Sequence, residues 1–173
     1  MKKQKYKSEE PYARKMIKGS LLVEERKRGL IEAVKEGNYE RCEKLLSKGA
    51  DPNKLSNGLS PLMAAAIKGD TKIGKLLLKH NADVDLIGKD RNTAMHYAAQ
   101  HKHWRFLEML LKTTPFPDPR IKNKEGKDVL AIAKENGAPE KVIKKIGHIE
   151  SCARLREVNR IYMYKWIEKI LSG

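Results

Sequence analysis

Cysteine is scarce in this sequence, with two in 173 residues. Cys42 and Cys152 lie far apart and form no CxxC pair, so the sequence predicts neither a disulfide framework nor a cysteine-based metal site. This cysteine usage suits a reducing compartment. We therefore expect a cytoplasmic protein, with the nucleus or delivery into a host cell as alternatives.

Long apolar runs and catalytic motifs are also missing. No run approaches the ~20 apolar residues that cross a bilayer, and no apolar stretch follows the basic first residues as in a secretory signal. The sequence has no GxSxG, no HExxH and no paired-carboxylate motif. The segment from Gly69 to Lys75 has the spacing of a phosphate-binding loop, but Leu76 follows where Ser or Thr must hold magnesium. Neither a transmembrane segment, an enzyme nor a cofactor is predicted.

Acidic residues are outnumbered by basic ones. The chain has 22 Asp and Glu against 37 Lys and Arg, a formal net charge of +15. Residues 1–28 alone hold ten basic and four acidic side chains. Such an excess favours acidic partners such as acidic proteins, nucleic acids or anionic lipids. Within this region, residues 1–19 predict a basic, flexible arm.

An internal repeat organises the rest of the chain. The segment Gly58–Gly69 recurs 33 residues later as Arg91–Lys102, and Leu77-Leu78 recurs at the same offset as Leu110-Leu111. A weaker copy begins near Leu30, and a fourth begins at Gly126. A fixed period of this length is typical of stacked helical repeats, in which one unit alone cannot bury its apolar face.

These residues resemble the ankyrin repeat, whose pattern is a Gly turn, Thr-Pro-Leu-His-x-Ala-Ala, a Gly, an apolar helix ending Leu-Leu, and Gly-Ala-Asp-x-Asn. The resemblance covers about 120 of the 173 residues. It implies an all-α solenoid of about four helix-turn-helix units with projecting loops and a C-terminal capping helix. We expect these boundaries: the arm 1–19; an array 20–147 with units of about 21–53, 54–86, 87–120 and 121–147; and the capping helix 148–173 after a break at Gly147.

Local chemistry explains why these residue types recur. Ser60 or Thr93 can cap a first helix, and Pro61 suits the first helical position because its missing N–H has no partner there. Asp128-Val129 replaces Thr-Pro in the fourth unit, which predicts a weaker helix start. Gly74 lies in mid-helix, where glycine costs roughly 0.5–1 kcal/mol relative to Ala.

Three histidines, His96, His101 and His103, are close enough in sequence to raise a metal site. His96, however, holds the His position of the repeat signature, where the ring normally bonds within the turn. The other two have no Cys or carboxylate set around them. The sequence therefore predicts no metal site.

The resemblance further implies that partners bind the loop tips and the exposed concave face of the first helices. The apolar members of the matching set are either interface residues or packed against neighbouring loops, and Phe116, in a proline-rich loop, is either displayed or folded back. The matching positions are Asn57, Leu59, Ile67, Lys68, His80, Ile87, Lys89, Asp90, Asn92, Gln100, His101, Phe116, Lys124 and Lys127.

Together these observations predict a monomeric scaffold or adaptor that binds an acidic protein through its concave face. The alternative is a nucleic-acid binder that uses the basic arm and the C-terminal segment, where Arg154, Arg156 and Arg160 accompany aromatic residues that could stack on bases. The competing interpretation of that segment is that its aromatic residues seal the last repeat, and the sequence favours this interpretation.

Overall fold

The computed structural model describes residues 29–114 and 117–154. The predicted arm, Phe116 and the basic and aromatic residues beyond 154 lie outside this part of the chain. The described residues form helices joined by loops, with one isolated β-bridge between Ser56 and Leu59.

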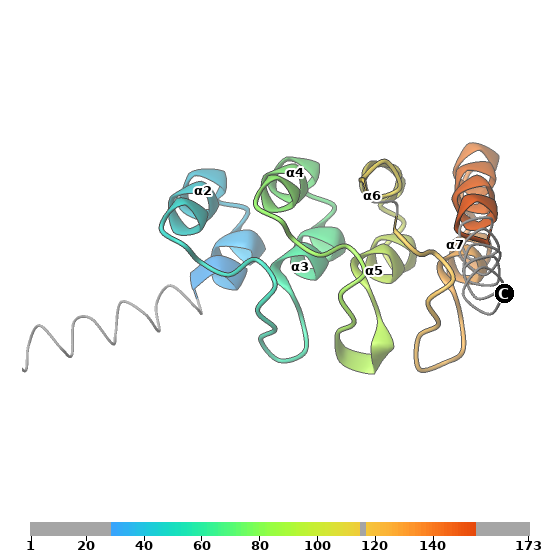
Figure 1. The fold of residues 1–173 in the computed structure, drawn as a ribbon, viewed down its shortest axis with the longest axis horizontal. Helices are drawn as coiled ribbons and strands as arrows, with labels where there is room; N and C mark the ends of the chain where they lie inside the picture. Colours follow the sequence, from blue (N-terminus) through green and yellow to red (C-terminus); the bar gives the residue numbers. More distant parts are fainter. Residues whose placement is uncertain (1–28, 115–116, 155–173) are drawn as a thin grey trace, which may run out of the picture.

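The described helices form four antiparallel pairs. The first helices of the pairs lie in one row and the second helices in another, and the loops project beyond the row of first helices (Figure 1). This arrangement confirms the predicted all-α repeat fold. In chain order the pairs are residues 29–36 with α2 (Tyr39–Ser47), α3 (Pro61–Lys68) with α4 (Thr71–Lys79), α5 (Ala94–Gln100) with α6 (Trp104–Leu110), and α7 (Val129–Glu135) with residues 140–154; a short 3-10 turn, η1 (Lys89–Arg91), lies in the third loop.

Side-chain caps start two of the first helices, α3 and α7. The Ser60 hydroxyl accepts the backbone N–H of Met63 at 3.2 Å, and Pro61 takes the first helical position, both as predicted. Asp128 accepts the N–H of Ala131 at 2.8 Å, so the fourth unit has a strong cap in place of the predicted weak start. A carboxylate is as good a helix cap as a hydroxyl.

His96 connects the third unit to the fourth. Its Nδ1 accepts the backbone N–H of Thr93 at 3.2 Å, so the proton lies on Nε2, which is 3.3 Å from the carbonyl oxygen of Lys127. The ring is fully buried, and this burial lowers its pKa. In the second unit Met63 takes the same place, with its sulfur accepting the N–H of Ser60 at 3.4 Å. The predicted structural role of His96 therefore agrees with its contacts.

Small residues bring neighbouring units close together. α3 packs against α5 and α5 against α7, with Ala65, Ala66, Ala98 and Ala99 fully buried at these positions. Alanine methyl groups allow helix backbones to approach without leaving cavities. A larger or charged side chain at these positions has no space.

Gly74 has the same function between second helices. A Cβ atom at Gly74 would lie 2.6 Å from Cε2 of Phe106, a fully buried ring on α6. The aromatic ring of the next unit thus fills the space that a side chain at position 74 would occupy. The stability cost predicted for glycine at position 74 does not include this packing, because the sequence around Gly74 does not reveal the contact.

The last helix is continuous through Gly147, and the predicted break there is wrong. Val142, Ile146 and Ile149 recur at helical spacing and are all buried, so packing on the last unit holds this helix despite its glycine. In Figure 1 it stands upright, whereas α6 is seen end-on, so the two helices diverge.

The two helical glycines should respond oppositely to the same substitution. Gly74→Ala should lower the free energy of unfolding by about 1–3 kcal/mol, because the new methyl group overlaps the Phe106 ring. Gly147→Ala should raise it by about 0.5–1 kcal/mol, because a Cβ there meets nothing within 4 Å. Urea unfolding followed by circular dichroism measures both. Stabilisation by Gly74→Ala would show that the two units are less tightly packed.

His96 should make the stability depend on pH. Its pKa is below 6.5 in the folded protein, so the unfolded chain takes up the proton first and the free energy of unfolding falls as the pH drops below about 6.5. One such group contributes at most about 1.4 kcal/mol per pH unit. His96→Met copies the residue of the second unit and should flatten this dependence. Urea titrations between about pH 7.5 and 5.5 compare the two proteins; identical slopes would contradict the assignment.

Candidate functional site

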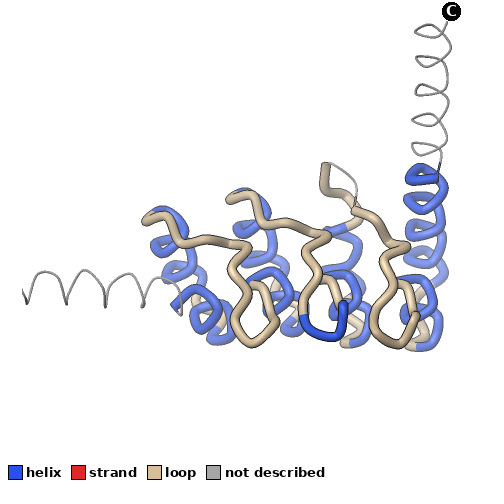
Figure 2. The backbone as a smooth tube through the Cα atoms, turned by 60° about the horizontal axis from the view of Figure 1, so that its bottom comes forward, coloured by secondary structure: helices blue, strands red, loops and turns tan. Residues whose placement is uncertain are grey.

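The loop tips form a continuous row along one edge of the array (Figure 2). Backbone hydrogen bonds join them: the N–H of Lys89 donates to the carbonyl of Gly58 at 2.7 Å, and the N–H of Lys124 donates to the carbonyl of Asp90 at 2.8 Å. These bonds join backbone groups and involve no side-chain atom. The row, which we call the loop-tip surface (residues 55–59, 87–92 and 122–127), therefore presents its side chains on a fixed backbone.

Glycines let the second and third tips meet. A Cβ atom at Gly88 would lie 2.5 Å from the carbonyl oxygen of Gly58 and 2.6 Å from the sulfur of Met63. Gly58 itself has a φ of +76°, and a Cβ there would lie 2.7 Å from that of Lys89. No other residue type allows this contact without a shift of the backbone.

The bases of the loops are joined as well. Asn53 accepts the N–H of Asp83 at 2.7 Å and donates to the carbonyl of Asn81 at 3.1 Å. One unit further on, the N–H of Asp118 donates to both carboxylate oxygens of Asp85 at 3.1 Å. Burial raises the pKa of Asp85. Each loop is thus attached to its neighbour at two levels.

Exposed apolar residues lie on this surface. Ile87 and Leu55 are each 41% exposed, whereas Leu59 is half-buried against the core and Ile67 is half-buried on α3. Ile87 thus keeps the exposure expected of an interface residue, and Leu59 packs against its surroundings. Sequence reasoning missed Leu55; an apolar residue within an otherwise polar loop was the available signal.

Several predicted polar residues are held in place by their own neighbours. Lys68 donates to the carbonyl of Lys35 at 2.6 Å, and Lys124 lies 3.7 Å from the Asp90 carboxylate. Lys127 pairs with Glu135 at 2.8 Å, which raises the pKa of the lysine. The remaining exposed members of the predicted set are Asn57, Lys89, Asp90, Gln100 and His101.

Two predicted partner-binding residues are not exposed on the loop tips or on the first helices. Asn92 is only 8% exposed, so its side chain lies beneath the loop and not on its surface. The sequence gives a loop position but not which side of the loop the side chain takes. His80 caps the end of α4, in the row of second helices, and is separated from the loop tips (Figure 1).

The other titratable groups are engaged structurally. His103 has its Nε2 3.0 Å from the carbonyl oxygen of Ile67, and its ring covers Gly69. Burial raises the pKa of Cys42 to about 11, so its thiol stays protonated. Within residues 29–114 and 117–154, no group of three or more His, Cys, Asp or Glu side chains could hold a metal ion, and no helix is long and apolar enough to span a membrane.

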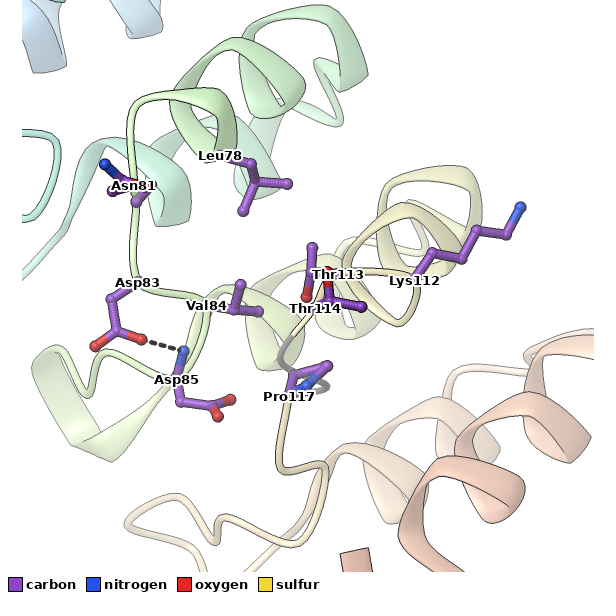
Figure 3. Close-up of a pocket in the computed structure, with 10 residues that line it drawn as sticks. Leu78, Asn81, Asp83, Val84, Asp85, Lys112, Thr113, Thr114 and Pro117 are labelled. Carbon is purple, nitrogen blue, oxygen red and sulfur yellow. Dashed lines mark hydrogen bonds between the residues drawn. The ribbon is translucent and has the colours of Figure 1, made fainter. Parts of the chain in front are cut away.

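A pocket of about 450 Å³ lies behind the loops, between the end of α4 and the segment that follows α6 (Figure 3). The Asp83 carboxylate accepts the N–H of Asp85 at 2.9 Å within it. Lys112 extends away from both aspartates (Figure 3). Asp83 and Asp85 thus each accept a backbone N–H group of the loop segments.

Comparison with known proteins agrees with the repeat geometry. A family model described as ankyrin repeats (3 copies) matches residues 30–122, more than half of the chain. The chain belongs to the ankyrin repeat family. This membership explains the repeated helix pairs and the row of loops described above.

Similar ankyrin repeat proteins are much longer than this chain. It is 34% identical over 108 residues to the ankyrin repeat and KH domain-containing protein mask of Drosophila melanogaster, a match that covers 61% of this chain and 3% of the fly protein. It is 34% identical over 104 residues to the human ankyrin repeat and KH domain-containing protein 1, covering 58% of this chain and 4% of the human protein. Human ankyrin repeat domain-containing protein 17 is 36% identical over 76 residues, 43% of this chain and 3% of that protein.

The Gly58–Gly88 contact should control the loop-tip surface. Gly88→Ala should push the second and third tips apart and break the bond from the Lys89 amide to Gly58, so that this amide exchanges with solvent at least about tenfold faster. The Lys124 amide, bonded to Asp90 in the next loop pair, is the internal control and should be unaffected. Hydrogen exchange by nuclear magnetic resonance measures both amides. Unchanged protection of Lys89 would mean that the tips are not joined.

Proposed function

We propose that this chain is an adaptor that binds an acidic protein partner through the loop-tip surface and the adjoining face of the first helices. Ankyrin repeats generally mediate protein–protein interactions. The observation that carries this proposal is the pair of exposed apolar side chains, Leu55 and Ile87, on loops whose backbones are bonded to each other. Exposed apolar groups rimmed by polar ones commonly mark an interface.

Pre-organisation supports the same proposal. A flexible loop loses conformational entropy when it binds, whereas a loop already fixed at its tip and base loses less. The loop-tip surface holds five basic side chains against two acidic ones, which favours approach of an acidic partner. The central apolar contacts would then decide how long the complex lasts.

Cross-linking in a cell lysate followed by mass spectrometry identifies the partner. The association and dissociation rates of the chain with that partner then test the proposed surface. The double variant Leu55→Ser with Ile87→Ser should speed dissociation at least about tenfold, because the apolar contacts at the interface centre are lost. Tyr39→Ser is the matched control, since Tyr39 is 37% exposed but lies on α2, away from the loop tips.

Equal dissociation from the double variant and the control would contradict the proposal. Recovery of nucleic acid in place of a protein, with affinity falling steeply as salt is raised, would instead favour the nucleic-acid alternative.

A further inference from the structure

A groove lies on the opposite side of the array from the loop tips. It runs between α6 and the helix of residues 140–154 and encloses about 700 Å³. It is open because these two helices diverge (Figure 1). By contrast, α4 and α6 close against each other where Phe106 fills the space at Gly74.

The floor of the groove is apolar and its rim is basic. Leu111, Ile149 and Cys152 form the floor. Lys112, Lys141, Lys144 and Lys145 contribute four positive charges to the lining, against a single acidic side chain, Glu108. An apolar trough with a rim of one charge sign fits a ligand that carries apolar groups and the opposite charge.

Glu108 offsets only one of the four rim charges, because it pairs with Lys145 and leaves three lysines. Its carboxylate lies 3.0 Å from Nζ of Lys145, and this hydrogen bond lowers the pKa of Glu108. Lys144 has only a loose contact, 3.9 Å, to Glu140, and both side chains are mostly exposed. Exposed pairs of this kind hold their partners weakly. Lys112 and Lys141 are exposed as well.

We propose that this groove binds an acidic amphipathic segment of a protein partner, with its apolar side chains on the Leu111–Ile149 floor and its carboxylates against the lysine rim. This interaction is separate from the loop-tip surface and leaves that surface free. An ankyrin array with both surfaces would join two proteins.

The geometry favours a peptide over a membrane or a nucleic acid. Leu111 and Ile149 line the groove but are only 3% and 8% exposed, so a flat bilayer surface would contact little of either side chain. Among the described residues, the lining contains no Phe, Tyr or Trp on which a base could stack, and its one ring is the imidazole of His148. Residues 155–173 of this chain are a poor occupant, because they hold four basic and two acidic side chains and so repeat the charge sign of the rim.

The probe is a fluorescein-labelled helical peptide of about 14 residues, with leucines at i, i+3, i+4 and i+7 and glutamates on its other faces. Fluorescence anisotropy with the full chain should show saturable binding. Lys141→Glu with Lys144→Glu should weaken it at least about tenfold. Lys72→Glu with Lys75→Glu is the matched control: it makes the same charge change on exposed residues of α4 and should leave the affinity within about twofold.

Cys152 provides a direct readout of occupancy. The chain has two cysteines, and the buried Cys42 thiol has a pKa of about 11, so native-state reaction with a disulfide reagent reports Cys152. Saturating peptide should slow this reaction severalfold. The same peptide with serines in place of leucines should neither bind nor protect.

Three results would overturn the proposal. The two charge-reversal variants could weaken peptide binding equally, or the serine peptide could bind as tightly as the leucine peptide. The chain could also bind no peptide while its Cys152 thiol is already protected from the reagent. Lysine-dependent binding to phosphatidylserine vesicles without peptide binding would assign the groove to a membrane surface instead. Leu55→Ser with Ile87→Ser should leave peptide binding unchanged, so failure of the loop-tip proposal and failure of this one are distinguishable.

Discussion

Close contact between neighbouring repeats is the constraint on which the rest of this structure depends. It is made by side chains that are small or absent: alanines between the first helices, Gly74 beneath Phe106, and Gly58 beside Gly88 at the loop tips. At each of these positions, atoms of the neighbouring unit fill the space that a larger side chain would occupy. A single helix pair has no such neighbour, and the stability of the chain therefore belongs to the stack.

The same contacts determine the loop-tip surface. Because the helix pairs repeat at a fixed spacing, their loops arrive side by side, and backbone bonds from Lys89 and Lys124 then join each tip to the preceding one. Ile87 and Leu55 are displayed on this row although both would be more stable buried. At the end of the array the spacing rule is broken, since the last helix diverges from α6, and the open groove is the consequence.

The fold could be predicted from the sequence because the same pattern of capping, small and apolar residues occurs in several units. Ser60, Pro61 and the Leu-Leu pairs specify one unit, and the 33-residue offset then specifies the stack. Features set by a single long-range contact could not be predicted this way. The role of Gly74 depends on Phe106, far along the chain, and Gly147 stays helical because Ile146 and Ile149 pack on the last unit. Loop side chains were the hardest case: Asn92 points beneath its loop, and Leu55 was missed.

The central claim is that neighbouring repeats fix the loop tips before any partner arrives. Nitrogen-15 relaxation of the free chain tests it most directly, at residues 56–59, 89–91 and 123–126. Our account predicts backbone order parameters of about 0.8 or higher, close to those of the helices. Order parameters below about 0.6 at these tips would contradict it, because such loops would have to become ordered on binding.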